Sequence, residues 1–187
     1  MIRMAIPADG ERLAAIYAPA VTDRATSFEL TAPDASEMAR RVSTLTARTP
    51  WLVLEENGRV LGYAYASPHR TRACYRWSAD VSVYVAADAR GNGIGHALYT
   101  ALLSILELQR FHAAFAGITL PNDASVALHE AVGFEALGVY REVGFKHGHW
   151  HDVGWWRRSL GSGGKPAEPA PFLANLDRFI ATRLLLS

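Results

Sequence analysis

Apolar and polar residues follow two different periods along this chain, and each period predicts one type of secondary structure. In residues 51–67, two apolar runs flank Asn57 and Gly58, a pair that favours the type I′ turn between antiparallel strands. Residues 80–85 place valine at every second position, which is typical of a strand with two unlike faces. The middle of the chain is therefore expected to form a meander of three strands.

A period near 3.6 residues marks the expected helices. Asp9 precedes apolar positions at helical spacing and is expected to cap a first helix. Asp34, with Glu37 three residues later, predicts a capping box at the start of a second helix. Residues 94–105 carry an apolar stripe, and a shorter helix farther along is expected to end at Gly133 as a left-handed cap.

The expected elements run in the order strand, two helices, three strands, helix, strand, helix and a pair of strands. This order predicts an α/β protein of the α+β type, with a mixed, mostly antiparallel sheet flanked by helices, in residues 1–160. Glycine and proline make residues 161–171 a predicted flexible linker. Residues 172–187 predict an amphipathic C-terminal helix that packs on its own domain or on a partner subunit, since its two arginines are too few for a membrane-surface helix.

Composition narrows the classes of function. The net charge of +1 gives no general attraction to nucleic acid or to a membrane surface. Cys74 is the only cysteine, which excludes an intrachain disulfide and a cysteine zinc cage. The first residues lack the apolar core of a signal peptide, and no apolar run is long enough to span a bilayer. We expect a soluble, cytoplasmic protein.

Residues 90–95 place three glycines between a strand and a helix, where backbone N–H groups and the helix dipole suit a pyrophosphate. A Walker loop is excluded because no lysine follows the glycines. The dinucleotide fingerprint needs glycine at its sixth position, where this chain has His96. An ordinary glycine-rich turn is the remaining alternative to an anion-binding loop.

With Arg90 in front, these glycines read R-x-x-G-x-G and resemble the acetyl-CoA loop of the GCN5-related N-acetyltransferases, the GNAT family. A second element, N-x-x-[AS]-x-x-x-[YH]-x-x-x-G-F, follows downstream in the order that the family has. Its matching residues are Asn122, Ser125, His129, Gly133 and Phe134.

Three longer stretches point to one branch of this family. The resemblance to that branch extends from about residue 2 to residue 160. The stretches are "TPWLVLEENGRVLGYAYASPHRTRACYRWSADVSVYV", "LPNDASVALHEAVGF" and "GFKHGHWHDVGWW", and they resemble the phosphinothricin and methionine sulfoximine acetyltransferase branch. The resemblance implies the GNAT fold, a homodimer, acetyl-CoA as cosubstrate and no metal. It also implies acetylation of the α-amino group of phosphinothricin, methionine sulfoximine or methionine sulfone.

The resemblance further implies which residues hold acetyl-CoA. The backbone of Val83, Tyr84 and Val85 is expected to pair with the pantetheine arm as an added strand does. Asn122 and Ser125 are expected to bond to the same arm. The glycine loop is expected to hold the pyrophosphate with Arg90, Gly91, Asn92, Gly93, Ile94, Gly95 and His96.

Two residues are candidates for proton transfer. Asp80 lies where relatives carry a glutamate base, and because its side chain is one methylene shorter we expect it to act through water. A purely structural carboxylate is the alternative. His129 lies where many relatives carry a tyrosine that protonates the leaving thiolate, although a lone histidine on a helix is often structural.

Arg70 and Arg72 are the candidates for binding the acceptor substrate. They lie two residues apart after a strand, and their guanidinium groups suit a carboxylate. In relatives the matching basic pair holds the α-carboxylate of the substrate, while a solvated basic loop is the alternative. Phe28, Tyr75 and Tyr84 are expected to line the acceptor pocket.

Two further interpretations remain open. His147, His149 and His151 alternate as zinc ligands on a strand would, but the resemblance places this segment in a metal-independent branch, at a subunit contact and pocket edge. The acceptor could instead be another small amine or a protein N-terminus, or the chain could bind CoA as a sensor without turnover.

Overall fold

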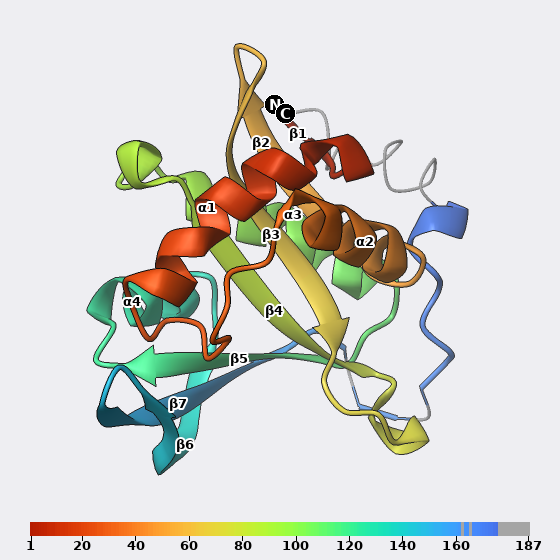
Figure 1. The fold of residues 1–187 in the computed structure, drawn as a ribbon. Coiled ribbons are helices and arrows are strands. Elements are labelled where there is room, and N and C mark those ends of the chain that lie inside the picture. The colour runs from red at the N-terminus through yellow and green to blue at the C-terminus, as the bar shows by residue number, and fades with distance from the viewer. Residues whose placement is uncertain (162, 165, 176–187) are drawn as a thin grey trace.

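The computed structural model describes residues 1–161, 163–164 and 166–175, and it shows a mixed sheet with helices on both faces (Figure 1). The strands and helices, in chain order, are β1 (Ile2–Met4), α1 (Gly10–Thr22), α2 (Ala35–Thr46), β2 (Trp51–Glu56), β3 (Arg59–Pro68), β4 (Ser78–Val85), α3 (Ile94–Leu108), β5 (Ala113–Leu120), α4 (Asp123–Ala131), β6 (Glu135–Lys146) and β7 (His149–Ser159). Short 3₁₀ turns lie at Pro7–Asp9, Ala73–Tyr75, Ala87–Ala89 and Leu173–Asn175. This order of elements confirms the sequence prediction for residues 1–160.

The strands pair in the order β1-β2-β3-β4-β5-β7-β6. All neighbours are antiparallel except β4 and β5, which are parallel. Helices α1 and α2 cover one face of the sheet, and α3 packs on the opposite face (Figure 1). The apolar stripe of α3 supplies several fully buried side chains of the core, among them Leu98, Leu102 and Ile105.

The parallel pair of β4 and β5 is short, and this positions the site. Only Ser78, Ala79 and Asp80 of β4 pair with β5, at Ala113 to Phe115. Beyond this point β5 continues alongside β7, while β4 continues alongside β3. Figure 1 shows the two strands crossing at their shared end and then diverging. From Val81 onward, β4 has one edge without a strand partner.

Most of the predicted turns and caps are confirmed. Asn57 and Gly58 have φ values of 50° and 75°, as a type I′ turn requires. The carboxylate of Asp34 accepts a hydrogen bond from the backbone N–H of Glu37 over 2.8 Å at the start of α2, which confirms the cap. The other half of the predicted capping box does not form, because the Glu37 carboxylate bonds to Arg40 and Arg41. Gly133 ends the α4 region with a φ of 85°.

The expected helix cap at Asp9 is wrong. Its carboxylate makes no capping bond to α1; it accepts from the backbone N–H of Ile6 over 2.8 Å and from both terminal nitrogens of Arg3 over 2.8 Å. Asp9 is nearly buried, and a bidentate guanidinium offers a stronger bond than a helix N–H does. The residue therefore ties β1 to the 3₁₀ turn before α1.

The C-terminal segment is described only in part. The amide of Gln109, at the end of α3, donates to the backbone oxygens of Arg48 and Ala170, over 2.8 and 2.6 Å. The indole N–H of Trp77 donates to the carbonyl of Ala167 over 2.8 Å, and Phe172 is fully buried. Of the helix expected over residues 172–187, the described part is a single 3₁₀ turn, and positions 176–187 lie outside the described residues. The linker and domain boundary remain predictions.

Among the helices that the structure describes, none is long and apolar enough to cross a membrane.

Candidate active site

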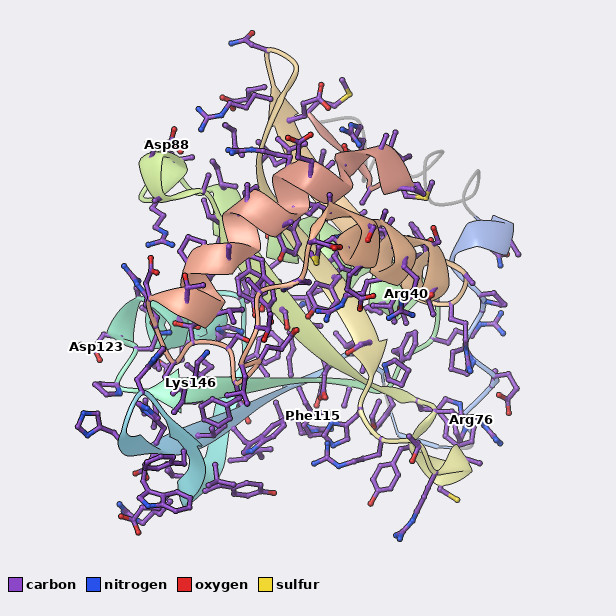
Figure 2. The ribbon with its side chains drawn as sticks, viewed as in Figure 1. Arg40, Arg76, Asp88, Phe115, Asp123 and Lys146 are labelled. Atoms are coloured by element: carbon purple, nitrogen blue, oxygen red, sulfur yellow. The ribbon has the colours of Figure 1, made fainter. Side chains whose placement is uncertain are left out.

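A groove of about 360 Å³ runs between the diverging end of β4, the glycine loop and α4. Side chains of α1 and the following loop, including Ile16 and Arg24, close its other side. The groove collects all but one of the residues expected to hold acetyl-CoA, namely Val83, Tyr84, Val85, Arg90, Gly91, Gly93, Ile94, Gly95, His96, Asn122 and Ser125. The exception is Asn92, which lines a separate hollow beside Arg59 and Asp88, the latter at the outer edge of the molecule in Figure 2.

The glycine loop leaves bare backbone at the start of α3. Gly91 and Gly93 have φ values of 80° and 74°, a region in which side chains are strained. A β-carbon at either position would meet no atom within 4 Å, so the space beside the loop is open. Gly95 differs, because a β-carbon there would lie 3.0 Å from Leu128 of α4. The first two glycines open the helix N-terminus to an anion, and the third lets α3 and α4 pack closely.

Both ring nitrogens of His129, on α4, make hydrogen bonds. Its Nδ1 is 2.7 Å from the backbone oxygen of Ser125, and its Nε2 is 2.9 Å from the hydroxyl of Tyr99. Because a carbonyl only accepts, Nδ1 carries the hydrogen and Nε2 accepts from Tyr99. Burial lowers the pKa of His129, and the bond to Ser125 acts in the opposite direction. The imidazole is therefore neutral at neutral pH, and Tyr99 and His129 line a small hollow beside Val83.

Asp80 is the last β4 residue paired with β5, and its carboxylate is already engaged. Its Oδ1 lies 2.6 Å from Nδ1 of His69, in the chain that follows β3. Burial raises the pKa of Asp80 above its usual range, while the bond from His69 and the nearby charge of Arg70 act in the opposite direction. This pair lies where the diverging strands meet.

A second pocket, of about 400 Å³, adjoins the Asp80–His69 pair. The rings of His69, Phe115 and Trp155 form part of its wall together with residues 137–140 of β6. Arg70 also lines this pocket, with its guanidinium 5.7 Å from the centre of the Trp155 ring and bonded to the carbonyl of His69 over 2.8 Å. A cation beside an aromatic wall is suited to a small anionic substrate.

The structure does not gather the other expected acceptor residues around this pocket. Arg72 and Tyr75 are exposed, and the Tyr75 ring lies 6.0 Å from the ring of His69, edge to face. Phe28 packs against Gly144 and lies 6.2 Å from the ring of His151. Tyr84 packs edge to face on Tyr17 at 4.8 Å, under α1. Of the acceptor residues expected from the sequence, Arg70 alone lines the pocket beside Asp80.

Lys146 holds the loop between α1 and α2 in place. Its ammonium group is buried and donates to the carbonyls of Ser27 and Glu29, over 2.7 and 2.8 Å. Figure 2 shows Lys146 beneath this loop, beside the hairpin of β6 and β7. The carboxylate of Glu29 in turn accepts both ends of the Arg41 guanidinium. These bonds join α2, the loop and the hairpin around the site.

The histidine-rich turn does not gather ligands for a metal. His147 lies in the turn with a φ of 50°, while His149 and His151 belong to β7. Nε2 of His151 lies 3.0 Å from the carbonyl oxygen of Lys146. Within residues 1–161, 163–164 and 166–175, no three histidine, cysteine, aspartate or glutamate side chains cluster as a metal site would require.

Sequence reasoning missed His69 and Tyr99. Ser67 pairs with Asp80 across the sheet, so His69, two residues later, falls on the same face beside that carboxylate. The register of β3 and β4 would have indicated this neighbour. Tyr99 interrupts the apolar pattern of α3 with a hydroxyl, and a buried hydroxyl requires a partner.

Comparison with known proteins identifies the family. A family model described as an acetyltransferase (GNAT) domain matches residues 2–155. Phosphinothricin N-acetyltransferase of Streptomyces viridochromogenes is 41% identical over 91% of each chain. The L-methionine sulfoximine/L-methionine sulfone acetyltransferase of Pseudomonas paraeruginosa is 35% identical over 91% of this chain and 98% of its own. The crystal structure of a phosphinothricin acetyltransferase of Sinorhizobium meliloti in complex with acetyl-CoA has a TM-score of 0.85 and 41% identity, over 90% of this chain and 93% of its own. Because these matches span most of the chain, it belongs to the GNAT family of N-acetyltransferases, in the branch of the phosphinothricin and methionine sulfoximine acetyltransferases.

Proposed function

We propose that this protein transfers the acetyl group of acetyl-CoA to the α-amino group of a small amino-acid-like substrate of the phosphinothricin or methionine sulfoximine type. The observation that carries the proposal is the position of Asp80. It lies at the meeting point of β4 and β5, three residues before Val83 of the groove and bonded to His69, which lines the pocket of Arg70. Relatives that act on these substrates match along nearly their whole length, which supports the same acceptor class.

The groove fits acetyl-CoA in shape and in chemistry. Gly91 and Gly93 present open backbone at the N-terminus of α3, which suits the pyrophosphate, and Arg90 adds positive charge. The unpaired edge of β4 offers backbone groups to an extended arm. Asn122 and Ser125 flank that arm from the start of α4. Acetyl-CoA supplies a thioester, whose carbonyl carbon accepts the amine.

The protein's own part is to orient the two reactants and to move protons. Orientation alone can supply roughly 7–11 kcal/mol of a barrier of this kind. Asp80 takes part in removing the proton from the acceptor's ammonium group. We assign the proton that the departing thiolate receives to the hydrogen-bonded pair of Tyr99 and His129, which lines the hollow beside Val83. In this step the O–H bond of Tyr99 breaks and its proton forms the S–H bond of CoA, and Tyr99 regains a proton from solvent after CoA leaves, while His129 stays neutral.

Arg70 is the proposed contact for the acceptor's carboxylate. Its guanidinium lies on the Trp155 ring in the pocket beside Asp80, where a carboxylate would also place its α-amino group near the meeting point of the strands. Arg72 lies outside that pocket and is assigned a secondary role in attracting the anion.

We also propose a homodimer that uses β6. This strand lies at the edge of the sheet, with nearly all its side chains exposed. An edge strand rich in exposed apolar side chains is suited to burial against a second copy. The exposed apolar residues of β6 are Leu137, Val139, Tyr140, Val143 and Phe145.

A thiol-release assay tests the proposed function. The purified protein and acetyl-CoA are incubated with phosphinothricin, methionine sulfoximine, methionine sulfone, the free amino acids and short peptides with free N-termini. We expect the highest kcat/KM with phosphinothricin or one of the two methionine derivatives. Turnover of peptides alone would show that the acceptor is a protein N-terminus and not a small amino acid. Tight CoA binding without turnover of any amine would favour a CoA sensor.

A further inference from the structure

Contacts with Asp80, Phe115 and Trp155 hold the imidazole of His69 in place. Its Nδ1 lies 2.6 Å from Oδ1 of Asp80, and its ring stacks on Phe115 with a centroid distance of 4.3 Å and an interplanar angle of 18°. Trp155 meets it edge to face at 6.0 Å. Only 13% of the side chain is exposed. Figure 2 shows Phe115 at the centre of this region, beneath β5.

The hydrogen bond fixes which nitrogen of His69 carries a proton. An ionised carboxylate only accepts, so Nδ1 of the neutral ring is the donor to Asp80 and Nε2 keeps its lone pair. In the part of the chain that the structure describes, no protein group bonds to Nε2. The ring lines the pocket that Arg70 and Trp155 share, which is the proposed acceptor pocket.

We propose that His69 is the base that takes the proton from the acceptor's ammonium group, and that Asp80 is a positioning residue that acts through it. This rests on the proposed acetylation of an amine. An N–H bond of the ammonium breaks, an N–H bond forms at Nε2 of His69, and the amine keeps the electron pair with which it attacks the thioester. The imidazolium, stabilised by the Asp80 carboxylate, then releases the proton to solvent and returns to its neutral form.

The surroundings of His69 are suited to this exchange. Asp80 of β4 stabilises the positive ring, while Arg70, in the same loop, opposes it. The Arg70 guanidinium is held against the Trp155 ring and the carbonyl of His69. The other titratable groups nearby are the hydroxyls of Tyr75, from the 3₁₀ turn, and Tyr140, from β6. Phe115 and Trp155 are uncharged, so among the described residues the charges nearest the ring are those of Asp80 and Arg70.

Steady-state kinetics of three variants test the proposal with the amine that the wild-type protein acetylates best. His69→Gln is expected to lower kcat about 100-fold, within the range for the loss of a general base, and to leave the KM for acetyl-CoA unchanged. Asp80→Asn should lower kcat at least tenfold, and the double variant should be no slower than His69→Gln. His112→Gln, at an exposed histidine outside the site, is the matched control and should retain the wild-type rate.

Rescue and pH dependence separate a base from a merely structural ring. Added imidazole should restore part of the rate of His69→Gly but not that of Asp80→Asn. The loss of kcat toward acidic pH in the wild type should be absent from His69→Gln. Wild-type kcat in His69→Gln, beside a 100-fold loss in Asp80→Asn, would overturn the proposal and leave Asp80 to act through water. Thermal unfolding and calorimetric CoA binding verify that each variant folds.

A nuclear magnetic resonance measurement tests the hydrogen bond between His69 and Asp80 independently of the proposed acetylation. Long-range ¹H–¹⁵N spectra of the neutral ring distinguish the two tautomers, and His69→Gln identifies the signal of His69. The Nδ1–H form is expected in the wild type and should be lost in Asp80→Ala, whose side chain has no acceptor. A wild-type ring in the Nε2–H form would overturn the pairing, whichever amine is acetylated.

Discussion

Asp80 and Phe115 form the last residue pair that joins β4 to β5. Before this pair the two strands share hydrogen bonds, and after it they diverge to open the groove beside the glycine loop. The pair therefore sets both the end of the groove and the wall of the acceptor pocket, where Phe115 supports the ring of His69. The proposed meeting point of the two reactants is the one parallel junction in the sheet that the structure describes.

Gly93→Ala is expected to raise the KM for acetyl-CoA about tenfold or more. The new methyl group meets no protein atom, so it projects into the groove beside the start of α3. Its φ of 74° also costs roughly 1 kcal/mol of stability. Gly58→Ala, at a φ of 75° in the distant turn between β2 and β3, carries the same strain and should leave the KM unchanged. Equal KM values in both variants would contradict the assignment of the groove.

Arg70→Ala is expected to raise the acceptor KM about 10- to 100-fold, because a charge-assisted bond to a carboxylate contributes on the order of 1.5–3 kcal/mol. Arg72→Ala should raise it only about twofold, since its side chain is exposed outside the pocket. The KM for acetyl-CoA is the internal control in both variants. The opposite ranking of the two would move the carboxylate contact to Arg72.

Tyr99→Phe is expected to destabilise the protein by about 1–3 kcal/mol, because Nε2 of the buried His129 loses its donor. It should also lower kcat about tenfold or more if the pair delivers the thiolate proton. Tyr63→Phe is the matched control: Tyr63 is also buried, but among the described residues no group bonds to its hydroxyl. Chemical denaturation and steady-state rates measure the two effects. Unchanged kcat in Tyr99→Phe would remove the pair from the mechanism.

Lys146→Met is expected to lower the melting temperature on the order of 5 °C, because the buried carbonyl of Ser27 and the half-buried carbonyl of Glu29 lose their donor. The loop between α1 and α2 should loosen, and because Arg24 and Thr26 of this loop line the groove, the KM for acetyl-CoA should rise more than the acceptor KM. Lys146→Arg keeps a donor and should recover part of the stability. A melting temperature equal to that of the wild type would show that the bonds to the loop contribute nothing net.

The pair of Arg3 and Asp9 predicts a stability that depends on pH. Burial acts to raise the pKa of Asp9, but the bonds from Arg3 and from the Ile6 N–H outweigh it and hold the pKa below its usual range. A lowered pKa in the folded state stabilises the protein above the unfolded pKa of about 3.9, and this stability is lost as the pH falls. Melting temperatures of wild type and Arg3→Met should therefore differ most at pH 7 and converge toward pH 3.

The matched control for this prediction is Arg40→Met. Arg40 pairs with Glu37 on the outer surface of α2, where water screens the charges (Figure 2). Its melting temperature should stay close to that of the wild type at both pH values. A constant difference between Arg3→Met and the wild type from pH 7 to pH 3 would contradict the role of Asp9.

Features encoded by neighbouring residues could be predicted from the sequence. The turn at Asn57 and Gly58 and the cap at Asp34 depend on local backbone chemistry, and both are confirmed. The glycine loop is contiguous in the chain, so its place at the start of α3 followed from its pattern. Asp9 failed as a cap because Arg3, from another element, bonds its carboxylate.

The acceptor pocket could not be predicted in the same way. Its walls come from the loop after β3, from β5, and from the hairpin of β6 and β7. The chain between β3 and β4 runs through a 3₁₀ turn at Ala73–Tyr75 and does not fix the strand register as a two-residue turn would. Without that register, the contact between His69 and Asp80 is invisible in the sequence. Phe28, Tyr75 and Tyr84 were expected to line the pocket. Tyr75 lies near it, 6.0 Å from the ring of His69, whereas Phe28 packs near His151 and Tyr84 packs under α1.

The bonds of Gln109 have a practical consequence for anyone who shortens this chain. Composition suggests a cut after Leu160, yet the segment beyond it returns to the core: Ala170 exchanges two hydrogen bonds with Gln109, and Phe172 is fully buried. A protein cut at residue 160 would expose the apolar surface that Phe172 covers, next to a buried amide stripped of one acceptor. We therefore expect a protein cut after Leu160 to be less stable than one that keeps the chain through Phe172.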